Sequence, residues 1–260
     1  MQALKRIICL TEETVETLYL MGEQDRIVGV SGFVVRPPEA RRKPKVSTFT
    51  DAKIDEILSL KPDLVFTFSD IQAEITANLM RAGLEVHAFN HRTVEGIFAM
   101  IRTVGALIGE PAKADALSSE LRVRVGAVRA QAKVLKRRPR VYFEEWDEPM
   151  ISAIGWVSEL IEIAGGENAF ADRAFGQAAK ERFVTSDEVI AAAPEIIIGS
   201  WCGKGFKKDQ LAARPGWDTI PAVKNGRLYE IKSSIILQPG PAALTDGLEA
   251  LQAIITTPKV

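Results

Sequence analysis

One long amphipathic stretch constrains the fold of this chain more than any other feature. From Ala112 to about Lys136 there is no proline, and apolar residues recur every three or four positions. This spacing is typical of a helix with one buried face. Pro111 suits the first turn of such a helix, and Pro139 keeps the residue before it out of helical geometry. At about 1.5 Å per residue the predicted helix is about 35 Å long, enough to span a small domain.

A short pattern occurs once on each side of this helix. Residues 56–69 and 188–200 each contain a glutamate, two apolar residues, then a proline, an acidic residue and a continuous apolar strand. Strands and amphipathic helices alternate in both halves, which is typical of parallel sheets covered by helices on both faces. The sequence therefore predicts an α/β protein with two Rossmann-like lobes, residues 1–111 and 139–260, joined by a connecting helix over 112–138.

Two helix starts carry capping signals. Thr11 precedes Glu12 and Glu13, so we expect Thr11 to cap the helix while the two acids oppose its positive end. Thr185 and Glu188 have the spacing of a capping box.

Charge and composition exclude several functions. The formal net charge is −1, so a general basic field for nucleic acid is absent, and we interpret the basic stretch Arg36–Lys45 as a solvated loop. No apolar run reaches the ~20 residues of a membrane-spanning helix, so the protein is not expected to be membrane-embedded. Cys9 and Cys202 lie in opposite halves and are predicted to be free thiols. Residues 1–13 do not read as an export signal, so either a signal was removed or the protein stays in the cytoplasm if Met1 is the native start.

The candidate site lies where the predicted strands end. Ligands of open α/β sheets bind beyond the carboxyl ends of the strands, and here those ends are rich in aromatic and small polar residues. Such a cleft between the lobes suits a large, flat, partly apolar ligand with polar edges. The alternative interpretation of Trp146, Trp156 and Trp201 is that these tryptophans only pack in the core and do not contact a ligand. The strand ends are residues 31–33, 68–70, 89–91, 144–147, 200–203 and 233–240.

The strand ends show no catalytic constellation. The acidic run at residues 144–148 is open to interpretation as an acid/base pair or a metal site, but adjacent strand residues alternate faces, so we favour a solvated strand end. His87 and His91 are the only histidines, so no metal site is expected. The glycines and lysine of residues 199–205 lack the spacing of a phosphate-binding loop.

Several segments together carry a family resemblance. The strands at Pro62 and Pro194, the connecting helix, the turn at residues 165–168 and the segment 223–229 resemble the helical-backbone (class III) periplasmic substrate-binding proteins of ABC importers. That family serves cobalamin, haem and ferric siderophores. Segments 142–149, 156–162 and 199–204 are most similar to its cobalamin-binding members.

The resemblance implies a non-catalytic, monomeric protein of the periplasm. It would bind one small-molecule ligand, cobalamin or a related tetrapyrrole, between the lobes and deliver it to an ABC permease, with no required cofactor. Ferric siderophore or haem is the alternative ligand, with His91 as the candidate axial residue for haem. A cytoplasmic carrier or sensor, or a hydrolase using Glu144 or Glu145, are the remaining alternatives.

The resemblance also assigns roles to residues. Glu74 falls where an acidic residue for permease docking is expected, whereas residues 204–209 of the second lobe are basic at the equivalent place. Flat contacts to the ligand are expected from Phe33, Phe68, Trp146, Trp156 and Trp201, and hydrogen bonds to its edge from Ser69, Asn90 and Gln238.

Overall fold

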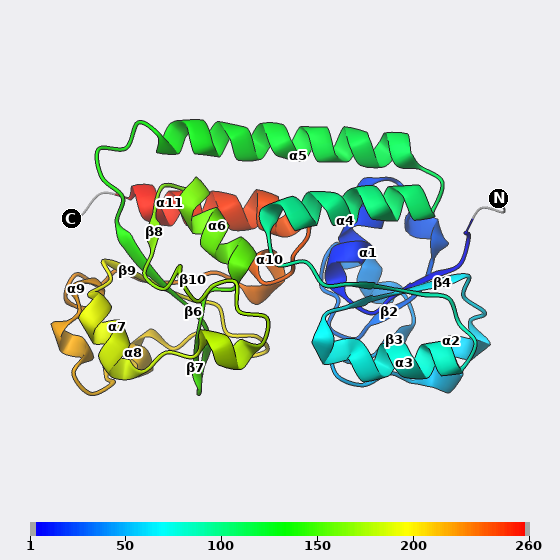
Figure 1. Ribbon diagram of the computed structural model, residues 1–260, viewed down its shortest axis with the longest axis horizontal. Helices are drawn as coiled ribbons and strands as arrows, with labels where there is room; N and C mark the ends of the chain where they lie inside the picture. Colours follow the sequence, from blue (N-terminus) through cyan, green and yellow to red (C-terminus); the bar gives the residue numbers. More distant parts are fainter. Residues whose placement is uncertain (1–3, 258–260) are drawn as a thin grey trace. The chain divides into compact units, whose positions relative to one another are not determined.

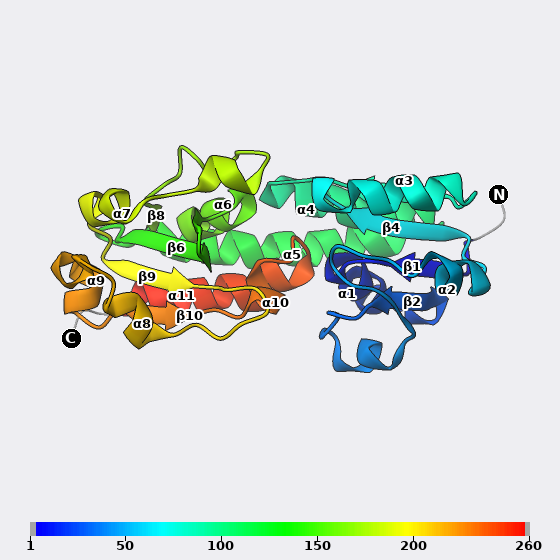
Figure 2. The same cartoon turned by 90° about the horizontal axis from the view of Figure 1, so that it is seen from below.

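The computed structural model describes residues 4–257, which form two compact units (Figures 1 and 2). Unit 1 comprises the chain up to residue 91 together with 95–121 and 239–241, and unit 2 comprises 92–94, 122–238 and the chain from 242 onward. Helix α5 (Pro111–Ala132) belongs to unit 1 in its first half and to unit 2 in its second half.

Helix α5 is shorter than the sequence predicts. It ends at Ala132 rather than near Lys136, and the amides of Val134 and Leu135 donate to carbonyls three positions earlier, which tightens the last turn. The turn places Leu135 against Gly165, at a point where a side chain on that glycine would collide with Leu135. Packing against this glycine therefore accompanies the end of the helix well before Pro139.

Unit 1 is built on a fully parallel sheet in the order β3-β2-β1-β4-β5. The chain first moves outward from β1 to β3 and then resumes on the other side at β4. This arrangement confirms the predicted parallel sheet. The strands are β1 (Ile7–Cys9), β2 (Ile27–Ser31), β3 (Lys45–Ser47), β4 (Leu64–Phe68) and β5 (Val86–Phe89).

Helices cover both faces of the unit 1 sheet. Helices α1 and α4 lie on one side and α2 and α3 on the other (Figure 1). Ile57, Ile75 and Leu79 of α2 and α3 pack with Ile8 and Val65 of the sheet in one buried cluster. The helices are α1 (Glu12–Leu20), α2 (Ile54–Ser59), α3 (Ala73–Arg81) and α4 (Val94–Leu107).

The basic stretch of unit 1 is not a simple loop. Pro38–Arg42 forms a 3₁₀ turn, and Lys45 begins β3, which pairs with β2. The prediction of a solvated loop over Arg36–Lys45 was therefore wrong at its end, because the valine and serine after Lys45 complete the sheet edge and are buried.

Unit 2 has a mixed sheet in the order β10-β9-β6-β7, with β8 also paired to β6. Only β7 is antiparallel. The sequence predicts that β6 ends at Glu144, but it continues to Asp147 and returns after Pro149 as β7. The strands are β6 (Arg140–Asp147), β7 (Met150–Ser152), β8 (Glu167–Asn168), β9 (Ile196–Gly199) and β10 (Leu228–Glu230).

Helices again cover both faces of the unit 2 sheet, with α6 and α11 on one side and α7, α8 and α9 on the other (Figure 1). The predicted capping box of α7 is confirmed, since Thr185 and Glu188 exchange both bonds. The closing helix begins with a π-helical turn at Ala243–Gly247. The helices are α6 (Gly155–Ile163), α7 (Ser186–Ala192), α8 (Lys208–Ala212), α9 (Pro221–Lys224), α10 (Ser233–Ile236) and α11 (Leu248–Thr256).

The two cysteines do not form a disulfide, as predicted, with Cys9 buried and Cys202 exposed. Between residues 4 and 257, no helix has the length and apolar character needed to cross a bilayer.

Candidate functional site

Each sheet has one point where the chain changes its winding direction. In unit 1 this point lies between β1 and β4, and in unit 2 between β6 and β9 (Figure 2). Ligands of α/β proteins bind beyond the carboxyl ends of the strands at such points. We call the residues that follow β1, β2, β4 and β5 the carboxyl edge of unit 1. The end of β6 and the residues that follow β9 form the carboxyl edge of unit 2.

A buried glutamine joins the strand ends of unit 1. Gln72 accepts a hydrogen bond from the backbone of Phe68 at 3.0 Å and donates to the carbonyls of Leu10 and Phe49 at 3.4 and 3.2 Å. Because Gln72 is fully buried, these bonds fix the ends of β1 and β4 to each other.

Glu12 and Glu13, at the start of α1, are buried rather than solvated. Thr11 is the N-cap residue, but the predicted side-chain cap is absent because its hydroxyl donates to Glu13 Oε1 instead. Glu13 Oε2 has no hydrogen-bond partner among the described residues, and Gly240 lies so close that its Cβ would be 2.5 Å from Glu13 Cβ. Desolvation by burial raises the pKa of both carboxyls to about 7.

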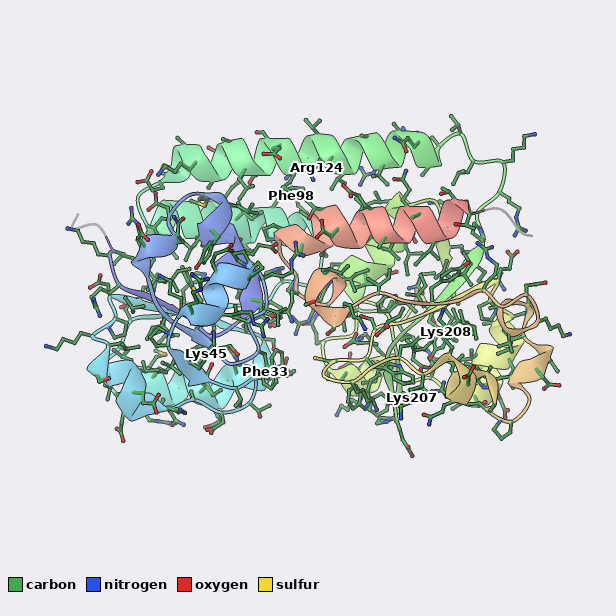
Figure 3. All side chains as sticks on the ribbon, turned by 180° about the vertical axis from the view of Figure 1, so that it is seen from behind. Phe33, Lys45, Phe98, Arg124, Lys207 and Lys208 are labelled. Carbon is green, nitrogen blue, oxygen red and sulfur yellow. The ribbon has the colours of Figure 1, made fainter. Side chains whose placement is uncertain are left out.

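The four predicted ligand contacts of unit 1 all lie at its carboxyl edge, in different states of exposure. Phe33 follows β2 and is 57% exposed (Figure 3), whereas Phe68 is buried at the end of β4. Ser69 has a positive φ of 64°, and its hydroxyl accepts a bond from the Ile71 amide at 3.3 Å, so its oxygen already serves a local turn. Asn90 is exposed after β5.

His91, the candidate axial residue for haem, is tied to its own unit. Its Nε2 lies 2.9 Å from the carbonyl oxygen of Pro239, and its ring packs edge-on against Phe68 with centroids 5.3 Å apart. Donation to that carbonyl requires a proton on Nε2, which is then not available to bind a metal.

The carboxyl edge of unit 2 contains an ion pair between fully buried Glu144 and half-buried Arg214. Glu144 receives two hydrogen bonds from Arg214, at 2.6 and 3.0 Å, one from the Tyr142 hydroxyl at 3.0 Å and one from the Trp201 indole at 3.0 Å. Arg214 also lies 4.6 Å above the ring of Trp217. The Glu144 charge is therefore paired and its oxygens are satisfied, and the indole of Trp201 is held in one orientation.

This geometry corrects the interpretation of the acidic run as a solvated strand end. Glu144 has no exposed surface, and Glu145 forms a salt bridge with Arg182, which is itself buried. Neither carboxylate is available as the acid or base that the hydrolase alternative requires. Among residues 4–257, no cluster of three metal-binding side chains occurs.

Two predicted tryptophans share one cation. The Lys204 ammonium lies 4.0 Å from the ring centroid of Trp146 and 5.3 Å from that of Trp201, and it pairs with Asp147. Trp146 also donates its indole N–H to the Glu148 carbonyl at 2.8 Å. The structure thus brings Trp146 and Trp201 together at the carboxyl edge of unit 2.

The other predicted residues lie apart from this group. Trp156 is buried in α6 and donates its indole N–H to the carbonyl of Ile236 at 2.9 Å, which favours the packing alternative. Gln238 is half-buried after α10. Glu74 is exposed in the first turn of α3.

A pocket of about 520 Å³ opens beside the Trp201 ring and lies wholly within unit 2. Its walls come from the turn between β6 and β7, the start of α7 and the end of α8. Polar and charged groups reach it from Asp147, Glu148, Gln210 and Arg214.

Sequence reasoning missed the ionic partners and two exposed aromatics. Arg214 is 70 residues from Glu144 and Arg182 is 37 residues from Glu145, so no local pattern connects them. Phe175 and Phe183, in the long loop before α7, are 48% and 40% exposed. The sequence signal that could have identified them is the presence of two phenylalanines in a loop that is otherwise rich in small and charged residues.

Comparisons with known proteins agree with this architecture. Residues 7–235 match the periplasmic binding protein family. The chain is 26% identical over 255 residues to the vitamin B12-binding protein of Vibrio parahaemolyticus, covering 96% of this chain and 90% of that protein. It is similar in structure to a possible iron-binding periplasmic solute-binding protein of Staphylococcus epidermidis, with a TM-score of 0.84 at 23% identity over 98% of this chain and 100% of the other. It is also similar to the periplasmic heme-binding protein RhuT of Roseiflexus sp. RS-1, with a TM-score of 0.81 at 25% identity over 97% and 100%. These similarities confirm the predicted fold class.

Proposed function

The chain belongs to the periplasmic binding protein family, and we propose that it is the substrate-binding component of an ABC importer whose ligand is a corrinoid. Members of this family bind solutes and are not enzymes. The chain is therefore not an enzyme, and the hydrolase hypothesis is excluded. The kinship to a vitamin B12-binding protein supports the ligand class.

One observation carries the proposal: two tryptophans lie against the same lysine, Lys204, at the carboxyl edge of unit 2. Trp146 is half-buried, and Trp201 is 5% exposed and lines the pocket of unit 2. The indole N–H of each ring donates a hydrogen bond that fixes the ring. Fixed aromatic rings bind flat macrocycles with little loss of side-chain entropy. Phe33 and Asn90 offer an exposed apolar ring and an exposed amide at the carboxyl edge of unit 1.

Haem is the second candidate because a heme-binding protein shares the fold at 25% identity. Haem binding most simply requires a histidine or tyrosine on the iron. The engagement of His91 Nε2 with the Pro239 carbonyl argues against that residue in this conformation. A corrinoid carries its own axial groups and has no such requirement, so the available side chains suit it better.

The partner would be a membrane permease, and the site of action the periplasm, as the family description implies. Exposed Glu74 in unit 1 and the exposed lysines at residues 207 and 208 of unit 2 (Figure 3) differ in charge. A permease that docks both units would therefore present basic groups to one and acidic groups to the other.

Titration calorimetry tests the ligand. Cobalamin is compared with cobinamide, haem and a ferric siderophore, each added to the same preparation. We expect 1:1 binding of cobalamin with a micromolar Kd or tighter and weaker binding of haem. Tight binding of haem or the siderophore without binding of cobalamin would assign a different ligand to the protein. If none of the four compounds binds, the proposed function is contradicted.

A further inference from the structure

We propose that the pocket of unit 2 is a subsite that accepts a carboxamide arm of the ligand and rejects the corresponding carboxylate. This inference rests on the proposed function, because a corrinoid carries carboxamide arms around its ring whereas haem carries carboxylates. The pocket shares Trp201 and Asp147 with the carboxyl edge of unit 2. A ring stacked at that edge can therefore extend an arm into it.

The size of the pocket fits an arm rather than the whole ligand. Its volume of about 520 Å³ is within the range of small-molecule pockets, which is roughly 300–1,000 Å³. A corrinoid with its nucleotide is too large to be enclosed there. The macrocycle would remain at the edge, against Trp146 and Trp201.

Arg214, which lines the pocket, and Lys204, which lies beside it on Trp201, each already have an acidic partner in the protein. Arg214 lines the wall, but both of its terminal nitrogens donate to the buried carboxylate of Glu144. Lys204 is paired with Asp147. Glu148 adds a negative charge to the wall. An entering carboxylate would lose water without gaining an uncompensated cation, which is costly.

A carboxamide meets complementary groups in the same space. Its NH₂ can donate to the carboxylates of Asp147 or Glu148, and its oxygen can accept from the side-chain amide of Gln210. A neutral amide also costs less to desolvate than a carboxylate. The pocket therefore distinguishes two groups of nearly the same shape by their charge and by their ability to donate.

The experiment compares cobalamin with its b-, d- and e-monocarboxylic acids, in each of which one amide arm is a carboxylate, by titration calorimetry at pH 7. At least one acid should bind about 10-fold or more weakly than cobalamin, because the carboxylates of Asp147 and Glu148 in the wall repel the new charge. If all three acids bind as tightly as cobalamin, the subsite is contradicted and the proposed function stands. If cobalamin itself does not bind, the proposed function fails and the subsite with it.

Charge variants identify the pocket as the source of the discrimination. Asp147→Asn releases Lys204 from its partner, so the affected acid should regain most of its affinity. Glu148→Gln, at an exposed turn residue, should restore part of it even if Asp147→Asn fails to fold. Asp218→Asn makes the same charge change at an exposed residue outside the pocket, and it should leave the ratio of the acid's Kd to the Kd of cobalamin unchanged. If this ratio is the same in all three variants and in the parent protein, the proposal is overturned.

Discussion

At the carboxyl edge of unit 1, Glu13 is buried with one carboxylate oxygen lacking a hydrogen-bond partner among the described residues. At the carboxyl edge of unit 2, Glu144 is buried just as completely, but against Arg214, Tyr142 and Trp201. Burial raises the pKa of Glu13 to about 7, whereas Glu144 is paired with the guanidinium of Arg214. The two units share a strand and helix pattern, yet they solve the burial of a carboxylate in opposite ways.

The largest effect is expected where a charge is already paired. Glu144→Ala leaves the half-buried guanidinium of Arg214 without its carboxylate and leaves the Tyr142 and Trp201 donors unpaired. We expect the free energy of unfolding to fall by about 3–5 kcal/mol, measured by urea denaturation. Glu249→Ala is the matched control, because its exposed pair with Arg124, at 3.8 Å, contributes less than about 1 kcal/mol. Equal losses in the two variants would show that the buried pair does not stabilise unit 2.

A pH-dependent effect is expected from unit 1. Because the pKa of Glu13 is raised above its unfolded value of 4.5, its contribution to stability is complete below pH 4.5 and is lost as the pH rises through about 7. Glu13→Gln mimics the protonated form, so the variant should be more stable than the parent at pH 8, by up to about 3 kcal/mol, and similar at pH 4.5.

Thermal unfolding at several pH values between 4 and 8 checks this expectation. Glu12 also has a raised pKa, with Glu13, Glu16 and Arg36 nearby, so part of the slope should persist in the variant. A Glu13→Gln variant that is less stable than the parent by the same amount at every pH would contradict the neutral state of Glu13.

An intermediate effect is expected on ligand affinity. Removing both rings with Trp146→Ala and Trp201→Ala deletes the flat surface of unit 2, and we expect the Kd for cobalamin to rise about 10- to 100-fold. Phe33→Ala makes the corresponding change at the edge of unit 1. If affinity is unchanged in the tryptophan variant while the protein stays folded, the assignment of the aromatic surface is wrong.

The smallest effect is expected at the helix cap of α7, whose neighbours Val184 and Ser186 line the pocket of unit 2. Thr185→Ala removes half of the capping box and should reduce the free energy of unfolding by about 1 kcal/mol. Differential scanning calorimetry measures the loss. A variant as stable as the parent protein would show that the capping box does not stabilise α7.

The comparison of the units also shows which features of the structure could be predicted from the sequence. The strand at Leu64–Phe68 and the capping box at Thr185 were predicted correctly, because their signals lie within a few adjacent residues. The burial and ion pairing of Glu144 were not predicted, because its partner Arg214 is 70 residues away in the sequence. The hairpin from β6 to β7 was missed because β6 continues beyond the predicted end at Glu144 with residues that resemble a polar loop.

The same limit applies to the candidate site. Trp146 and Trp201 were identified because they follow strands, and the structure places both beside Lys204. Trp156 and Trp201 are almost equally buried, at 3% and 5% exposed, but Trp201 lines the pocket of unit 2 whereas Trp156 donates to the carbonyl of Ile236 within the core. Residue type identifies candidates, and only the packing around each ring decides whether part of it reaches a pocket.

The central claim is that the carboxyl edge of unit 2 binds a corrinoid. Amide hydrogen exchange, measured by mass spectrometry with and without saturating cobalamin, tests it most directly. We expect slower exchange in residues 144–147 and 199–204 of unit 2 when cobalamin is bound. Unchanged exchange in both segments, with cobalamin bound, would contradict the claim.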